Sequence, residues 1–257
     1  MTQFLIVGDT HGSIHSWKAI INNTKSRPYA KIIQVGDFGL WDHTAKGVAY
    51  LDDLNLILAH HGRHVYALGG NHENWDHWNW YLEHMPKDKD GFAILRSHIR
   101  LAPRVHRVKW DEKQFLFVAG AASIDKTERL IHMRSSANPV ATWWPQEQLT
   151  DDEVDRVSTM PANYMFSHDC SNHTPWRRQL IPDFDSQIHR QKIDTILKKV
   201  KPNFHWHGHM HQKFDWQNRV DGDRYVQTYG LDADAAPNSY GILDTEADVF
   251  KYYPQLY

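Results

Sequence analysis

The sequence has one cysteine, no long hydrophobic run and almost no net charge, and each shortage excludes a class of protein. Cys170 alone cannot form an internal disulfide or a thiolate metal site, which favours a reducing compartment. The apolar run Phe4–Val7 follows no basic segment, and no run approaches the ~20 residues that span a bilayer. A net charge of −2 provides no bulk attraction for nucleic acid. We therefore expect a cytoplasmic protein with no membrane partner and no strong nucleic-acid patch.

Histidine and tryptophan, by contrast, are abundant, with 19 and 11 residues in a chain of 257. Neutral imidazole is a common metal ligand, so the histidine content is a first indication of metal chemistry. Hydrophobic residues make up 41% of the chain, which suffices for a large ordered core. No linker, internal repeat or low-complexity segment interrupts the sequence, and we expect a single domain over residues 1–257.

Strands and helices alternate in the first third of the chain. Buried strands are expected at 4–8, 31–36 and 63–69, separated by amphipathic helices over 13–25 and 45–61. Ser13 and Thr150 are expected to cap helices. Further elements are expected as a helix at 74–85, strand pairs near 93–101, 105–110 and 114–119, a helix after 150, a strand at 163–167, a helix at 186–200, a strand at 203–206 and short strands from 213 to 253. This order predicts an α/β protein with a parallel βαβαβ unit.

Five short blocks place metal-ligand residue types directly after predicted strands. They are Gly8-Asp9-Thr10-His11-Gly12, Gly36-Asp37-Phe38-Gly39, Gly70-Asn71-His72-Glu73, Ser167-His168-Asp169 and Gly208-His209-Met210-His211. The carboxyl ends of parallel strands meet at one edge, so the blocks can form one site, and glycine before a ligand permits close backbone approach. Mixed oxygen and nitrogen ligands suit two divalent cations that share Asp37. We expect manganese first, with Fe, Zn, Co or Ni as alternatives that affinity order does not separate.

Taken in order, the five blocks resemble the signature of the calcineurin-like metallophosphoesterases. The resemblance covers roughly residues 4–245. It implies a four-layer αββα sandwich of two mixed sheets flanked by helices, with a dinuclear metal site between the sheets. It also implies that one ion is held by Asp9, His11, Asp37 and His211, and the other by Asp37, Asn71, His168 and His209. His72 matches the family's catalytic histidine, which is not a ligand.

The resemblance implies metal-dependent hydrolysis of a small phosphate ester or nucleotide. A metal-activated hydroxide would attack phosphorus in line, because metal binding lowers the pKa of water. His72 would stabilise the transition state or protonate the leaving oxygen. Trp41 and Trp75 flank the blocks and are candidates to stack on a nucleobase. The alternative is a non-catalytic interaction module on the same fold, although such relatives typically lose ligands and none is missing here.

The blocks depart from those of protein Ser/Thr phosphatases at two arginine positions. The second block continues as Gly39-Leu40-Trp41 without arginine, and Gly69 stands where arginine would precede the third block. Without these bidentate donors we expect a preference for phosphodiesters, and Gly69 leaves room for a second ester group. Ser123-Ile124-Asp125-Lys126 and Trp143-Trp144-Pro145 look more like small bacterial and bacteriophage metallophosphoesterases, and this resemblance implies phosphodiester substrates, cyclic nucleotides among them. A phosphatase-like phosphomonoesterase is the alternative, with cations from residues 121–145 replacing the clamp.

Residues 121–145 lack clear hydrophobic periodicity, and a loop of this length in a compact domain is usually functional or mobile. We predict a flap over the site that contacts substrate through residues such as Arg129 and Arg134. The alternative is an ordinary surface excursion packed by the two tryptophans Trp143 and Trp144.

Four further polar residues near the blocks are expected to support the site without reacting. Glu73 would cap or orient the third block. Asp169 would accept a hydrogen bond from a ligand imidazole, or it is a plain loop aspartate. His205 and His207 alternate with the ligands His209 and His211, but Gly208 is expected to break the strand between the pairs, so the first two are interpreted as structural.

Overall fold

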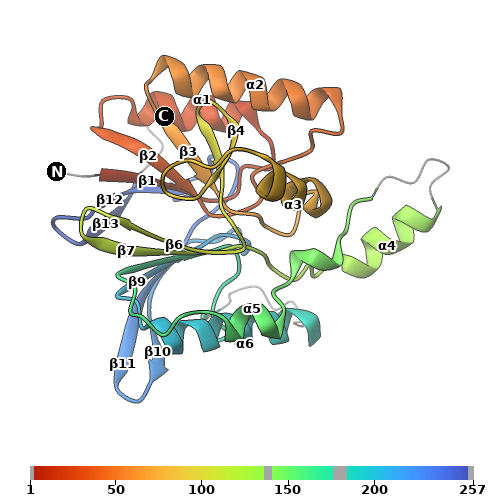
Figure 1. Ribbon diagram of the computed structural model, residues 1–257. Coiled ribbons are helices and arrows are strands. Elements are labelled where there is room, and N and C mark those ends of the chain that lie inside the picture. Colours follow the sequence, from red (N-terminus) through yellow and green to blue (C-terminus); the bar gives the residue numbers. More distant parts are fainter. Residues whose placement is uncertain (1–2, 136–140, 176–183, 254–257) are drawn as a thin grey trace.

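The computed structural model describes residues 3–135, 141–175 and 184–253 of the chain. In these residues two β-sheets stack face to face, and helices cover both outer sides (Figure 1). The predicted four-layer αββα sandwich of two mixed sheets is therefore confirmed. None of the helices in the described ranges combines the length and the apolar character that a membrane crossing requires.

The first sheet has the strand order β13-β12-β1-β2-β3-β5-β4. Its central strands run parallel to one another and are β1 (Gln3–Val7), β2 (Tyr29–Gln34), β3 (His64–Ala67) and β5 (Ile99–Leu101). Its outer strands pair antiparallel with their neighbours and are β4 (Ala93–Arg96), β12 (Tyr240–Asp244) and β13 (Val249–Tyr252). The parallel core of this sheet is the predicted βαβαβ unit.

The second sheet has the strand order β10-β11-β9-β8-β7-β6. Its parallel strands are β7 (Lys113–Val118), β8 (Tyr164–Ser167), β9 (Phe204–His207) and β11 (Arg224–Gly230). Its antiparallel edge strands are β6 (Val105–Trp110) and β10 (Phe214–Asp221). Both sheets thus bring the carboxyl ends of several parallel strands to one side of the molecule.

The helices form the outer layers. The first sheet is covered by α1 (Ile14–Thr24), α2 (Ala45–His60) and α3 (Trp75–His84), and the second by α5 (Asp151–Asp155) and α6 (Phe184–Val200). The predicted caps are present, because Ser13 accepts a hydrogen bond from the backbone of Ser16 and Thr150 forms a capping box with Glu153. A 3-10 turn, η1 (Pro145–Glu147), precedes α5.

Strand β7 shows how one strand can serve two hydrophobic layers. Phe115 and Phe117 belong to the aromatic core between the sheets, where Phe115 lies 5.0 Å from the Phe4 ring of the first sheet. The alternate residues Leu116 and Val118 belong to the separate cluster beneath α6. Because successive side chains of a strand point to opposite faces, an uninterrupted apolar run is required when both faces are covered.

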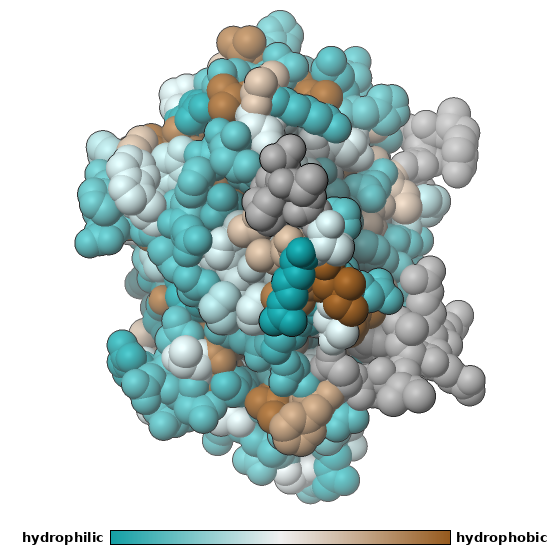
Figure 2. Space-filling model, turned by 90° about the vertical axis from the view of Figure 1, so that its right-hand side faces the viewer, coloured by the Kyte–Doolittle hydropathy of each residue, from teal (hydrophilic) through white to brown (hydrophobic). Residues whose placement is uncertain are grey.

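The prediction that residues 121–145 lack regular structure is wrong for α4 (Lys126–Ser135). Residues 136–140 of this predicted flap lie outside the described part of the chain. Helix α4 projects to one side of the sandwich (Figure 1). Its buried residue is Arg129, a cation, and its apolar content is low. A helix anchored by a charge has no apolar stripe, so hydrophobic periodicity could not detect it. The face from which α4 projects is largely hydrophilic, with hydrophobic groups in separate small patches (Figure 2).

Candidate metal centre

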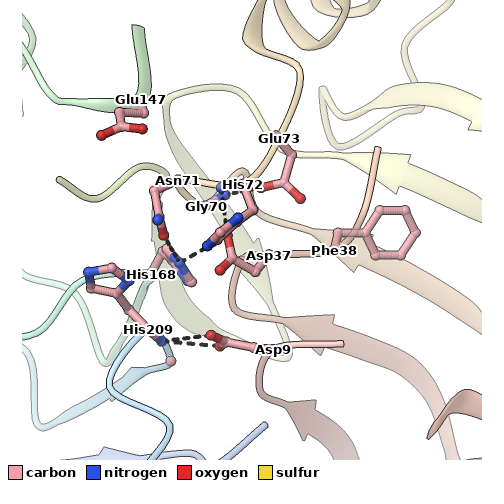
Figure 3. A network of polar contacts seen from close by, with 12 residues as sticks. Asp9, Asp37, Phe38, Gly70, Asn71, His72, Glu73, Glu147, His168 and His209 are labelled. Carbon is pink, nitrogen blue, oxygen red and sulfur yellow. Dashed lines mark hydrogen bonds and ion pairs between the residues drawn. The ribbon is translucent and has the colours of Figure 1, made fainter. Parts of the chain in front are cut away.

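The five blocks converge at the ends of strands from both sheets, as predicted (Figure 3). In the first sheet, β1, β2 and β3 end shortly before Asp9, Asp37 and Asn71. In the second sheet, β8 and β9 end just before His168 and His209. The side chains of these residues point into one common space between the sheets.

One group of four predicted ligands is compact, with two buried carboxylates and with His211 exposed to solvent. It consists of Asp9, His11, Asp37 and His211, whose ligand atoms all lie within 4.8 Å of one another. Nε2 of His211 is 3.0 Å from Oδ2 of Asp9, and Nε2 of His11 is 3.5 Å from Oδ2 of Asp37. Two carboxylates and two imidazoles form a donor set that suits a divalent transition metal.

A second, more deeply buried group forms around His168. Its Nε2 atom is 3.0 Å from Oδ1 of Asn71 and 3.2 Å from Oδ1 of Asp37, and its Nδ1 atom is 2.9 Å from the carbonyl oxygen of Val35. A bond from Nδ1–H to that carbonyl directs the Nε2 lone pair into the site. The ring of His209 lies 5.0 Å from the ring of His168. Asp37 therefore directs one carboxylate oxygen to each group.

The backbone is unusual at four of the predicted ligands. His11, Asp37, His209 and His211 have φ values between 44° and 62°. Non-glycine residues seldom adopt these angles, which cost on the order of 1–3 kcal/mol each and cluster at functional sites. The surrounding hydrogen bonds hold this geometry; the backbone N–H of His209, for example, donates to both carboxylate oxygens of Asp9 at 3.1 Å.

Glycine allows the close approaches that the blocks require. A Cβ atom on Gly70 would lie 2.2 Å from Oδ1 of Asp37, and a Cβ atom on Gly208 would lie 2.0 Å from Oδ1 of Asp9. Both distances are far shorter than van der Waals contact. Any side chain at either position would displace a predicted ligand, which confirms the interpretation of these glycines from the sequence.

Carboxylates dominate the electrostatic field of the site. Burial alone would lower the pKa of His168, but Asp37 and Asp9 outweigh it and raise the pKa to about 10. Burial also opposes protonation of His11, yet a hydrogen bond and the charge of Asp37 raise its pKa to about 9. In the second group, burial lowers the pKa of His209 to about 4 and keeps that imidazole neutral. The field that protonates two histidines is the field that a divalent cation would satisfy.

His72 stands beside the ligand groups, in contact with an arginine from α4. Its backbone N–H donates to Oδ1 of Asp37 at 2.9 Å, and its ring lies 5.8 Å from the ring of His11. Nη2 of Arg129 is 2.6 Å from Nε2 of His72. Burial lowers the pKa of His72, Asp37 opposes that change, and Arg129 adds to it. Of the two arginines predicted to contact substrate, Arg129 reaches the site, whereas Arg134 is exposed.

Three of the four residues predicted to support the site are placed as expected, His207 among them as a fully buried side chain, and one differs. Glu73 accepts hydrogen bonds from the backbone of Gly39 and Gly70, so it orients two of the blocks as expected. His205 is fully buried and lies 2.6 Å from the Ser167 hydroxyl, which fits a structural role. Asp169 instead lies 2.8 Å from Nδ1 of His189 on α6, so its predicted bond to a ligand imidazole is wrong.

Two expectations about space around the third block are also wrong. Trp75 is fully buried and stacks with the Arg104 guanidinium at 3.7 Å, so it cannot reach a nucleobase. The volume beside Gly69 is filled as well, because a Cβ atom there would lie 2.7 Å from the Trp75 ring. A second ester group therefore needs another location.

Three residues that the sequence did not single out as part of the site support the ligands. The amide nitrogen of Asn71 donates to the Ser123 hydroxyl at 3.1 Å, and Ser123 donates to both carboxylate oxygens of Glu147 at 2.7 Å. These hydrogen bonds turn the Asn71 oxygen toward His168 (Figure 3). Asp234 lies 3.1 Å from Nδ1 of His11, although 223 positions separate the two residues. No local pattern marks a partner at such a separation.

Comparison with known proteins gives a family and a fold. A model of the calcineurin-like phosphoesterase family matches residues 2–213. No curated protein matches the sequence. One solved structure covers 99% of this chain and 99% of its own at 11% identity and a TM-score of 0.50, a likeness that shows the fold alone. An archaeal phosphodiesterase covers 97% of both chains at 13% identity with a TM-score of 0.43, and Yfce, a phosphoesterase from E. coli, covers 99% and 100% at 12% identity with a TM-score of 0.43.

Proposed function

The chain belongs to the calcineurin-like phosphoesterase family, and from that premise we propose that it is a dinuclear metal-dependent hydrolase of phosphodiesters. The observation that carries the proposal is the position of Asp37, whose two carboxylate oxygens face different groups of ligands. One ion would be held by Asp9, His11, Asp37 and His211, and the other by Asp37, Asn71, His168 and His209. The donor set fits manganese and also Fe, Zn, Co or Ni.

When bound, the ions would supply an activated water and neutralise charge on the phosphate. The residues of the chain provide the remaining catalytic functions. His72 lies at the rim of the ligand groups and would stabilise the transition state or hold the proton that the leaving oxygen receives. Arg129 fixes the ring of His72 from α4, and Asp37 fixes its backbone. His72 is thereby positioned without being needed as a ligand.

The preference for diesters rests on the charge that surrounds the site. Arg129 is the cation nearest His72, but its Nε atom donates to Asp125 at 2.9 Å, and its Nη1 atom donates to the carbonyls of Asn71 and Thr142 at 3.2 Å. The residue is only 8% exposed. Because Asp125 balances its charge and backbone oxygens occupy its donors, Arg129 is a poor clamp for a phosphomonoester dianion. A diester, which carries a single negative charge, fits this field better.

The test compares kcat/KM for matched aryl monoesters and diesters of phosphate at saturating manganese, together with the metal content of the purified protein. We expect two ions per chain and faster hydrolysis of the diester. A monoester preference of tenfold or more would overturn the diester assignment and leave the family unchanged. Protein that binds no metal and hydrolyses neither ester would instead support the non-catalytic interaction module.

A further inference from the structure

A cavity of about 400 Å³ opens next to His72 and is not used by the chemistry described above. Its mostly apolar lining includes Trp41, Lys46, His72, Ala141, Thr142 and Trp144. The volume is typical of a site that holds one small organic group. The cavity thus offers the location for an ester substituent that the filled space beside Gly69 does not provide.

The two indole walls of this cavity are fixed by hydrogen bonds. Nε1 of Trp41 donates to the carbonyl oxygen of His72 at 2.8 Å, and Nε1 of Trp144 donates to Oδ2 of Asp76 at 3.0 Å. Side chains held in this way lose little freedom when a ligand binds, so the site is preorganised. Flat aromatic walls favour a flat aromatic occupant, because rings stack with one another.

Arg129 joins the cavity to the reaction centre. Its Nη1 atom donates to the carbonyl of Thr142, which lies in the cavity wall, and its Nη2 atom contacts the ring of His72. One guanidinium therefore positions both the wall and the histidine. A group bound in the cavity would place its ester oxygen next to His72.

We propose that this cavity, the aryl pocket, binds the aromatic ring of the alcohol that leaves the phosphate, such as a phenol, a naphthol or a nucleoside base. The proposal rests on the proposed phosphoesterase function. It assigns the leaving side of the ester because His72, the candidate to act on the leaving oxygen, is part of the pocket lining. The non-leaving group would lie on the opposite side of the phosphate.

The first experiment uses diesters that differ in one ring at a time. One pair has the same methyl group and carries a phenol or a naphthol of matched acidity as the leaving group. A second pair has the same leaving phenol and carries methyl or naphthyl on the other side. We expect about tenfold higher kcat/KM for the naphthol leaving group and no gain for the naphthyl non-leaving group. A gain that follows the non-leaving group, or no dependence on ring size, would overturn the proposal.

Two variants test whether the preference for the naphthol leaving group arises in the aryl pocket. Ala141→Phe fills the pocket without removing a hydrogen-bonding side chain and should remove the preference for the naphthol. Trp216→Ala removes an exposed tryptophan on β10 and should leave the preference as in the wild type. Equal preference in the wild type and Ala141→Phe would contradict the assignment of the pocket.

A binding measurement separates this inference from the proposed function. Free 1-naphthol is titrated into the metal-free protein and followed by quenching of tryptophan fluorescence. Binding that Ala141→Phe weakens by about tenfold supports the pocket, even in a preparation that hydrolyses no ester, where the proposed function alone would fail. Turnover of diesters without such binding would leave the function in place and overturn the aryl pocket.

Discussion

The blocks at the strand ends and the segment over residues 121–147 meet at the same site but are built differently. The blocks directly follow buried parallel strands. Their predicted ligands have strained backbone angles, and they lie against glycines at which any Cβ atom would clash with a ligand side chain. The segment contributes α4, which projects from the sandwich and is attached to the site mainly through one arginine (Figure 1). The metal chemistry that we propose would therefore belong to the strand ends, and we expect the segment to control how substrate is held.

The largest effect is expected within the blocks, at Asp37. Asp37→Asn removes a charge that both ligand groups share, so it should lower occupancy by both ions while the fold is retained. Changes to partners outside the ligand shell typically cost about 10–100-fold, and loss of a shared ligand should cost more. Metal content and kcat/KM are measured together.

Asp234→Asn is the matched control for this prediction, because Asp234 contacts His11 from outside and is half exposed. Its effect should stay below that of Asp37→Asn. Full activity of metal-stripped Asp37→Asn would show that the dinuclear assignment is wrong.

The second-largest effect on activity is expected at His72, which belongs to the third block and contacts Arg129 of α4. His72→Ala should lower kcat by about 10²–10⁴-fold, since a positioned proton donor typically contributes that much. The loss should be greater for esters of poor leaving alcohols, which depend more on protonation. Both ions should be retained, as measured by metal analysis; a variant that loses metal would place His72 among the ligands.

The two regions also differ in how far the sequence could predict them. Each ligand block could be identified because it places a carboxylate, amide or imidazole directly after an apolar run, in most cases next to a glycine, as in Gly36-Asp37 after β2. Apolar runs and helical periodicity predicted most of the strands and helices, whereas their arrangement in two stacked sheets was implied by the family resemblance. Segment 121–147 carries no such signal, because α4 is anchored by Arg129 and not by an apolar stripe. The partner predicted for Asp169 is wrong because its actual contact, His189, comes from a distant helix.

A smaller effect is expected within the segment, where two arginines of α4 provide a matched pair. Arg129 contacts His72, Asn71 and Thr142, whereas Arg134 is exposed. Arg129→Ala should lower kcat/KM about tenfold, because it removes the hydrogen bonds that position His72 and the Thr142 carbonyl, without changing the metal content. Arg134→Ala should change kcat/KM less than about twofold. Unchanged kinetics in both variants would favour a surface excursion over a flap.

The smallest effect concerns stability and comes from Glu147, which ties the segment to Asn71 through Ser123. Burial raises the pKa of Glu147 from 4.5 to about 7, and hydrogen bonds from Ser123 only partly offset it. Between these two pH values the folded protein keeps a proton that the unfolded chain has lost. The free energy of unfolding should therefore fall as the pH rises through this window, by at most about 1.4 kcal/mol for each pH unit.

Glu147→Gln removes that proton while preserving the shape of the side chain, and the Ser123 hydroxyl can accept a hydrogen bond from the new amide. Denaturant unfolding of metal-free protein at pH 5, 6 and 7 should show the wild type losing stability relative to the variant, on the order of 2 kcal/mol over the range. Glu128→Gln, on the exposed face of α4, should follow the wild type. The histidines of the blocks titrate in all three proteins, so their contribution cancels in the comparison. Parallel pH curves for wild type and Glu147→Gln would mean that Glu147 is already ionised at pH 5, so that Ser123 donates its hydrogen bonds to a charged carboxylate instead of a neutral carboxyl group.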